Sequence, residues 1–174
     1  CVAASAGNHA QGVAYAASSA GVRATIVMPE FSPAAKIQAT LGYGAQLVLH
    51  GRTYDEALKR ASEICEEWKS VFIHSFDDPK IIAGQGTIGL EMQEDMPDLD
   101  VIVVPVGGGG LISGVSIGLR NIMPHVEIYG VQASGAPSMA HSLKEGKIVE
   151  LPAVDTIADG IAIKRPSNLT FDIT

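Results

Sequence analysis

Short apolar runs alternate with amphipathic or alanine-rich segments along the whole chain. Runs rich in β-branched residues predict strands at residues 2–4, 23–28, 46–49, 71–75, 101–106 and 127–132. Helices are expected between them, and strands that alternate with helices build βαβ units with parallel neighbouring strands. The pattern therefore predicts an α/β fold of open, twisted, mostly parallel sheets with helices on both faces.

Capping residues mark where two of these helices begin. Ser5 or Asn8 is expected to cap a helix over residues 9–20, which Gly21 ends. A second helix start is expected at residues 167–168, where a serine precedes an asparagine.

The segment over residues 53–69 has the features of an amphipathic helix. Thr53 is followed three residues later by Glu56, which is the spacing of a capping box. The expected apolar face consists of Ala57, Ile64 and Trp68. The many charged residues between them predict that the opposite face is solvated.

A polar cluster interrupts the alternation of strands and helices after Phe76. It reads Asp-Asp-Pro-Lys over residues 77–80, a composition typical of a connection between structural units. We therefore expect two domains, one in residues 1–76 and one in residues 77–174.

Composition and charge exclude several classes of function. Hydrophobic residues make up 47% of the 174-residue chain, which is enough for a packed core, and aromatic residues make up 5%. The formal net charge is −7 and there is no basic cluster, so a nucleic-acid partner is not expected. Two widely spaced cysteines, Cys1 and Cys65, predict neither a disulfide framework nor a cysteine-based zinc site.

The chain shows no targeting or membrane segment. No signal peptide is visible, so a cytoplasmic location is expected. Residues 101–119 carry no charge, but Pro105 and six glycines lie among them, which argues against a membrane span. The chain has no initiator methionine, and we expect it to be the central fragment of a longer protein.

Four consecutive glycines follow the apolar run VIVVPV and precede a helix-like segment. This arrangement lets several backbone N–H groups converge on one anion at a helix N-terminus, as a phosphate group requires. It does not match a Walker loop, because Val115 and Ser116 stand where Lys-Ser or Lys-Thr is needed. The dinucleotide-binding pattern G-x-G-x-x-G also fails, because its last position is Ile112 when counted from Gly107 and Ser113 when counted from Gly108. The pattern thus predicts a cradle for a single phosphate, and the alternative is a turn that needs glycine for close packing alone.

The segment SAGNHAQG, residues 5–12, follows the first predicted strand and opens a helix. Its small residues, with Ser5 and Asn8, place N–H groups and two polar side chains where α/β folds hold ligands, and a carboxylate would fit there. The alternative is an ordinary helix cap, with His9 as a structural histidine. A third loop, residues 156–160, carries one acid and one glycine and is a weak signal by itself.

Four segments together resemble one known family. They are SAGNHAQG (5–12), DDPKIIAGQGTIGLE (77–91), PVGGGGLISG (105–114) and TIADGIAIKRP (156–166). In this order and spacing they resemble the threonine and serine dehydratases, the threonine ammonia-lyase group of fold-type II pyridoxal-phosphate enzymes, which includes serine racemase. The resemblance covers essentially the whole chain and implies the tryptophan synthase β-like fold.

The resemblance assigns roles to particular residues. It implies that the phosphate of pyridoxal 5′-phosphate is bound by the backbone N–H groups of Gly107, Gly108, Gly109, Gly110 and Leu111. It implies a loop for the substrate carboxylate formed by Ser5, Gly7, Asn8 and His9. Asn8 would also bind the 3′-hydroxyl of the cofactor ring, and Gly160 would lie near that ring.

The resemblance also places the catalytic residue outside this stretch. The Schiff-base lysine of the family belongs to a motif upstream of residues 5–12, and the residue that faces the pyridine nitrogen lies downstream. Lys36 matches a different family position and is not assigned that role. No catalytic residue is therefore expected among residues 1–174, and the fragment alone should be inactive.

Two departures from the racemases favour elimination over racemisation. Ala6 stands where serine racemase has a second serine that exchanges a proton at Cα, and a methyl group cannot do so. Gln132 and Ser138 stand where the racemases carry cation-binding acids, so no metal site is expected.

The expected activity of the complete protein is pyridoxal-phosphate-dependent dehydration and deamination of L-threonine and L-serine. The products would be 2-oxobutanoate or pyruvate, with ammonia, and the cofactor would bind between the two domains. The resemblance implies a homo-oligomer, and it leaves open whether the role is biosynthetic or degradative. The alternatives are serine racemase, another β-elimination or β-replacement enzyme, and a non-catalytic phosphate-binding module.

Overall fold

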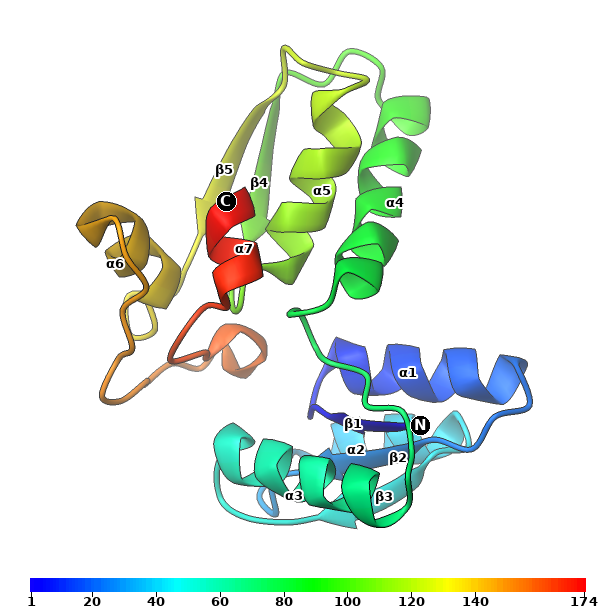
Figure 1. The fold of residues 1–174 in the computed structure, drawn as a ribbon. Helices are drawn as coiled ribbons and strands as arrows, with labels where there is room; N and C mark the ends of the chain where they lie inside the picture. The colour runs from blue at the N-terminus through cyan, green and yellow to red at the C-terminus, as the bar shows by residue number, and fades with distance from the viewer. The chain divides into compact units, whose positions relative to one another are not determined.

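The chain folds into two compact units, Cys1–Ser75 and Phe76–Thr174, in a computed structural model that describes residues 1–174. Figure 1 follows the chain from its blue N-terminus to its red C-terminus. Both units alternate strands with helices, and all strand pairs are parallel. The α/β class and the parallel sheets expected from the sequence are confirmed.

The first unit is a three-stranded sheet of order β1-β2-β3 between helices. Its elements are β1 (Val2–Ala4), α1 (Asn8–Ser19), β2 (Thr25–Met28), α2 (Ala34–Gly42), β3 (Gln46–Leu49) and α3 (Tyr54–Glu67). Ala3 pairs with Ile26, which in turn pairs with Leu47. The second strand begins two residues later than the predicted range.

Both faces of this sheet are covered because its strands are apolar at successive positions. Ala3, Ile26 and Met28 face α1, whose alanines at 10, 14 and 17 let the helix approach closely. Val2, Ala4 and Val27 form the other face and pack against α3. Figure 1 shows α1 and α3 on opposite sides of β1. Helices on both faces are thus confirmed for this sheet.

Residues 71–75, predicted as a strand, form a single parallel bridge between Phe72 and Val2. Val2 N–H donates to Val71 O, and Ile73 N–H donates to Val2 O, at 2.9 and 2.8 Å. The strand prediction is wrong because the ladder stops at this bridge: the next carbonyl on this edge of β1, Ala4 O, accepts from the Ser75 hydroxyl. The segment nevertheless lies on the edge of β1 opposite to β2.

Helix α3 confirms the predicted capping box. Thr53 Oγ1 accepts from Glu56 N–H, and Glu56 in turn accepts from the backbone N–H of Thr53. Ala57 and Ile64 are buried, but Trp68 is wrongly placed in the apolar face, because it lies after the last helical residue and is 54% exposed.

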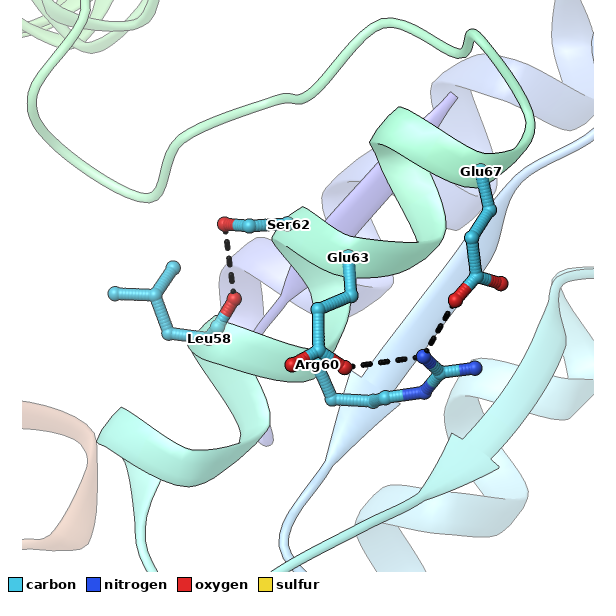
Figure 2. A network of polar contacts seen from close by, with 5 residues as sticks. All are labelled: Leu58, Arg60, Ser62, Glu63 and Glu67. Atoms are coloured by element: carbon cyan, nitrogen blue, oxygen red, sulfur yellow. Dashed lines mark hydrogen bonds and ion pairs between the residues drawn. The ribbon is translucent and has the colours of Figure 1, made fainter.

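The solvated face of α3 carries a small ion-pair network. Arg60 Nη1 lies 3.1 Å from Glu63 Oε2 and 2.9 Å from Glu67 Oε1. Figure 2 draws both contacts as dashed lines. All three side chains are solvent-accessible, so water screens the pairs and they add little to stability. Arg60, Glu63 and Glu67 are therefore paired with one another on the solvated face.

The second unit holds two parallel strands and their helices. Its elements are α4 (Pro79–Asp95), β4 (Val101–Pro105), α5 (Gly110–Arg120), β5 (Glu127–Val131), α6 (Ser138–Glu145), the 3₁₀ turn η1 (Asp159–Ile161) and α7 (Asn168–Ile173). Ile102 and Val104 pack under α5, while Val103 and Tyr129 on the opposite face are 61% and 53% exposed. None of the helices in the structure has both the length and the apolar character needed to cross a bilayer.

Helices α4 and α5 approach each other through glycines. A Cβ atom on Gly118 would lie 2.5 Å from Gly86 O, and a Cβ atom on Gly114 would collide with the backbone of α4 at Ile82. The segment GQGTIG in α4 has the spacing G-x-G-x-x-G, but it lies inside a helix rather than in a strand-to-helix turn. Its second and third glycines, Gly86 and Gly89, contact α5, so they serve packing.

Candidate functional site

The turn after β1 lies at a position where parallel α/β sheets bind ligands. The chain runs from β1 through β2 to β3 on one side, then returns through α3 to the opposite edge of β1. This reversal is a topological switch point, and ligands bind outside the carboxyl ends of the strands there. Ser5 is the first residue beyond β1 and is anchored by its N–H to Val27 O at 3.1 Å.

The start of α1 is not capped by the residues that the sequence suggested. The N-cap is Gly7, with no side-chain cap, and Asn8 is the first helical residue. Ser5 Oγ accepts from Gly7 N–H at 3.1 Å, which shapes the turn and does not cap the helix. Because the first turn contains no acidic residue and Asn8 is exposed, this helix start can accept an anion.

His9 has the structural role that the sequence suggested as an alternative. Its Nε2 lies 3.1 Å from Ile73 O, and a carbonyl can only accept, so Nε2 carries the proton. Burial lowers the pKa of His9. The hydrogen bond to Ile73 opposes this shift, and the nearby His74 adds to it. His9 is therefore neutral near pH 7 and ties α1 to residues 71–75.

Ser75 makes a second connection to β1. Its hydroxyl donates to Ala4 O at 3.0 Å and lies 3.4 Å from the hydroxyl of Tyr54 on α3. Burial raises the pKa of Tyr54, so its phenol remains protonated. The carboxyl end of β1 is thus bonded on one side to β2, through Ser5 N–H, and on the other side to Ser75.

The glycine run forms the turn between β4 and α5. Gly109 is the N-cap of α5 and has a left-handed backbone with φ of 95°, a conformation that favours glycine. No side chain caps α5, its first turn contains no acid, and Gly108–Gly110 are buried. A buried helix start without a capping side chain has N–H groups that need an acceptor, as a bound phosphate would provide.

The side of the run where side chains would project is filled by packing. A Cβ atom on Gly108 would lie 2.5 Å from the Phe76 ring, and one on Gly110 would lie 2.7 Å from Phe76 Cβ. A Cβ atom on Gly109 would lie 2.7 Å from Met139 Cε and 2.8 Å from Thr170 Cβ. Close packing, weighed above as the alternative, therefore explains these glycines by itself, and the backbone N–H groups are what remains for a ligand.

No sequence motif points to Phe76, Met139 or Thr170, which lie outside the run in sequence. The pattern of polar residues after Phe76 places it at the end of the first domain, but its ring packs on Gly108 in the second unit.

The loop containing Gly160 lies beside the glycine run. A Cβ atom on Gly107 would lie 3.1 Å from Ile161 Cα, so the 3₁₀ turn packs on the first glycine. Gly160 itself is exposed, and nothing lies within 4 Å of its Cβ position. Its proximity to a cofactor ring stays a prediction, as do the ligand roles of the other site residues.

Gln132 and Ser138, which the resemblance places at the cation positions of the racemases, make structural hydrogen bonds here. Gln132 Nε2 donates to Val106 O at 3.1 Å, and its Oε1 accepts from Ala140 N–H at 2.8 Å. Ser138 is buried, and its hydroxyl donates to Ile163 O at 2.8 Å. These bonds brace the end of β5 and the start of α6 near the glycine run.

The chain therefore combines two parallel α/β units, one with a topological switch point after β1 and one with a buried, uncapped helix start after a glycine run, which is the class of fold that binds phosphorylated ligands. The chain belongs to the family described as pyridoxal-phosphate dependent enzymes, whose model matches residues 1–174. The resemblance seen in the sequence is thereby confirmed.

Particular relatives refine this assignment. The L-threonine ammonia-lyase of Thermotoga maritima is 55% identical over 172 residues, which cover 99% of this chain and 43% of that protein. Among solved structures, the processed form of threonine deaminase isoform 2 from Solanum lycopersicum is 47% identical, with a TM-score of 0.91, covering 98% of this chain and 47% of that one. Maize serine racemase is 38% identical, with a TM-score of 0.93, covering 99% and 52%. The chain thus spans about half the length of the relatives it matches.

The residues present fit the phosphate of the family cofactor. The start of α5 offers amide N–H groups in a buried setting without a competing carboxylate or capping side chain. The helix dipole adds partial positive charge at the same place. The N–H groups that the resemblance assigns to the phosphate, from Gly107 to Leu111, include this helix start, and their role stays a prediction.

Proposed function

We propose that the complete protein is a pyridoxal-phosphate-dependent threonine ammonia-lyase. It converts L-threonine to 2-oxobutanoate and ammonia, and L-serine to pyruvate and ammonia. The observation that carries the proposal is the buried, uncapped start of α5 behind four glycines. The 55% identity to a protein named L-threonine ammonia-lyase supports the choice of reaction.

The residues of this chain divide into two tasks. Bound pyridoxal phosphate supplies the electron sink that acidifies the Cα proton of the amino acid. The amides of Gly107–Leu111 anchor the phosphate, and Asn8 binds the ring hydroxyl. Ser5, Gly7, Asn8 and the backbone N–H of His9 bind the substrate carboxylate at the positive end of α1. A lysine outside residues 1–174 would take the Cα proton, and the β-hydroxyl would take up a proton and leave as water.

Ala6 favours elimination over racemisation. Its methyl group packs against the core between the sheet and α1, directly beside Ser5 in the proposed carboxylate turn. A methyl group neither gives nor takes a proton, so this position cannot return a proton to the opposite face of Cα. We therefore propose dehydration rather than the racemase activity in the name of the maize relative.

Location and oligomeric state form two further parts of the proposal. We place it in the cytoplasm, because Cys1 and Cys65 are both free. We also propose that it forms a homo-oligomer, following the family resemblance. Gel filtration of the complete protein with light scattering tests the second statement.

The complete protein, incubated separately with L-threonine and L-serine, tests the reaction. We expect 2-oxo acid and ammonia in equal amounts, with little D-serine. Dominant D-serine would contradict the role given to Ala6, and cofactor binding without any product would favour a non-catalytic binding module. Borohydride reduction followed by peptide mapping should locate the cofactor on a lysine outside residues 1–174, and attachment to Lys36 would contradict the assignment.

A further inference from the structure

Thr170 connects α7 to the glycine run across 62 residues of sequence. Its side chain is fully buried, and its hydroxyl oxygen lies 2.7 Å from the carbonyl oxygen of Gly108. Its Cβ packs on the same run, so a side chain on Gly109 would collide with it. The contact therefore combines a short hydrogen bond with packing on adjacent residues.

The capping box of α7 directs the Thr170 proton toward Gly108. Ser167 Oγ accepts from Thr170 N–H at 3.2 Å and lies 2.9 Å from Thr170 Oγ1. A threonine hydroxyl has one proton, and the shortest acceptor near it is Gly108 O. Ser167 must then donate to Thr170, which leaves every polar group of this pair satisfied.

Fixing the Gly108 carbonyl also fixes an amide proton. The peptide between Gly108 and Gly109 is trans, so its C=O and N–H point in opposite directions. With the carbonyl held toward Thr170, the N–H of Gly109 points away from α7. Because neither glycine has a side chain, the orientation of this peptide plane is weakly restricted by its own residues, and the hydrogen bond favours one orientation.

We propose that Thr170 is a positioning residue that orients the Gly109 amide toward the cofactor phosphate. This inference rests on the proposed function, because it assumes that the run binds that phosphate. Thr170 does not touch the phosphate itself and acts through the backbone. Its loss should therefore weaken binding of the phosphate group specifically, while other parts of the cofactor are still recognised.

The test compares two ligands that differ in the phosphate alone. Dissociation constants of pyridoxal phosphate and of pyridoxal are measured with the cofactor-free, complete protein. In the variant Thr170→Val, which keeps the shape and removes the donor, we expect pyridoxal phosphate to bind about tenfold more weakly. Pyridoxal should bind within about twofold of its original affinity, and Thr170→Ser should restore the preference for the phosphorylated ligand.

Thr40→Val is the matched control. Thr40 is also fully buried and also donates its hydroxyl to a carbonyl, that of Lys36 at 3.0 Å, but it lies on α2 in the first unit. This variant should keep the preference of the unmodified protein. If Thr170→Val fails to fold, Thr170→Ala against Thr170→Ser answers the same question.

The possible results separate the two proposals. Equal weakening of both ligands by Thr170→Val, or no weakening of either, would overturn the role of Thr170 alone. An unmodified protein that binds pyridoxal phosphate no better than pyridoxal would overturn the phosphate cradle itself, and the inference with it.

Discussion

The two candidate turns both follow a parallel strand and open a helix, yet they are held in opposite ways. The turn at residues 5–9 is shaped by its own side chains, such as Ser5 Oγ with Gly7 N–H, and Asn8 stays exposed. The glycine run has no side chains, and the space that its side chains would need is occupied by Phe76, Met139 and Thr170.

The difference indicates what each turn can offer a ligand. The first turn offers side chains on a backbone with free space around Gly7. The second offers backbone amides on a surface that tolerates no side chain. A rigid amide cradle suits the phosphate of a cofactor that stays bound, and the more accessible first turn suits contacts with the substrate and with the cofactor ring.

One pair of substitutions tests this contrast most strongly. Gly109→Ala places a Cβ against Met139 and Thr170 in a left-handed conformation, so it should cost at least about 2 kcal/mol of folding stability. Gly7→Ala meets nothing within 4 Å and should change stability by less than about 0.5 kcal/mol. Urea unfolding of the complete protein measures both, and equal losses would abolish the distinction between the turns.

A second pair examines the helix that carries the glycine run. Gly118→Ala brings a Cβ to within 2.5 Å of Gly86 O, so separation of α4 and α5 should cost about 1–3 kcal/mol. Gly12→Ala on α1 has open space and should stabilise by about 0.5–1 kcal/mol through helix propensity. The expected signs are opposite, and thermal unfolding detects them. A stabilising Gly118→Ala would show that the two helices do not pack as described.

Asn8 should affect cofactor binding without affecting stability. Since its side chain caps nothing, Asn8→Ala should leave unfolding within about 0.5 kcal/mol while lowering pyridoxal phosphate affinity about fivefold. Thr53→Ala is the reverse control, because it removes a real cap and should cost about 1 kcal/mol with unchanged affinity. Cofactor titration and urea unfolding give the two readouts. Unchanged affinity in Asn8→Ala would remove the residue from the proposed site.

The smallest expected effect is a pH dependence from His9. Its pKa in the fold is below the ordinary value of 6.5, so the unfolded chain binds more protons between those two values. Stability from this residue is complete above pH 6.5 and falls as the pH drops through that interval. Unfolding free energies at several pH values should show the slope, and His9→Asn should reduce it. An identical slope in the variant would assign the effect to another group.

Local sequence patterns were sufficient where structure depends on neighbours along the chain. Thr53 with Glu56 and Ser167 at the start of α7 were recognisable caps, because capping uses residues within one turn. The apolar runs of β1, β3 and β4 predicted parallel strands for the same reason. Trp68 was misplaced because helical spacing continues past the point where the helix actually ends at Glu67.

Contacts between distant residues were settled by the tertiary structure. The sequence alone determined an α/β chain with a glycine turn before a helix, and by resemblance a pyridoxal-phosphate family. It could not determine that Phe76 and Thr170 occupy the rear of that turn, or that GQGTIG packs one helix on another. Side-chain periodicity records which face of an element is buried, whereas the partner on that face is decided when the whole chain packs.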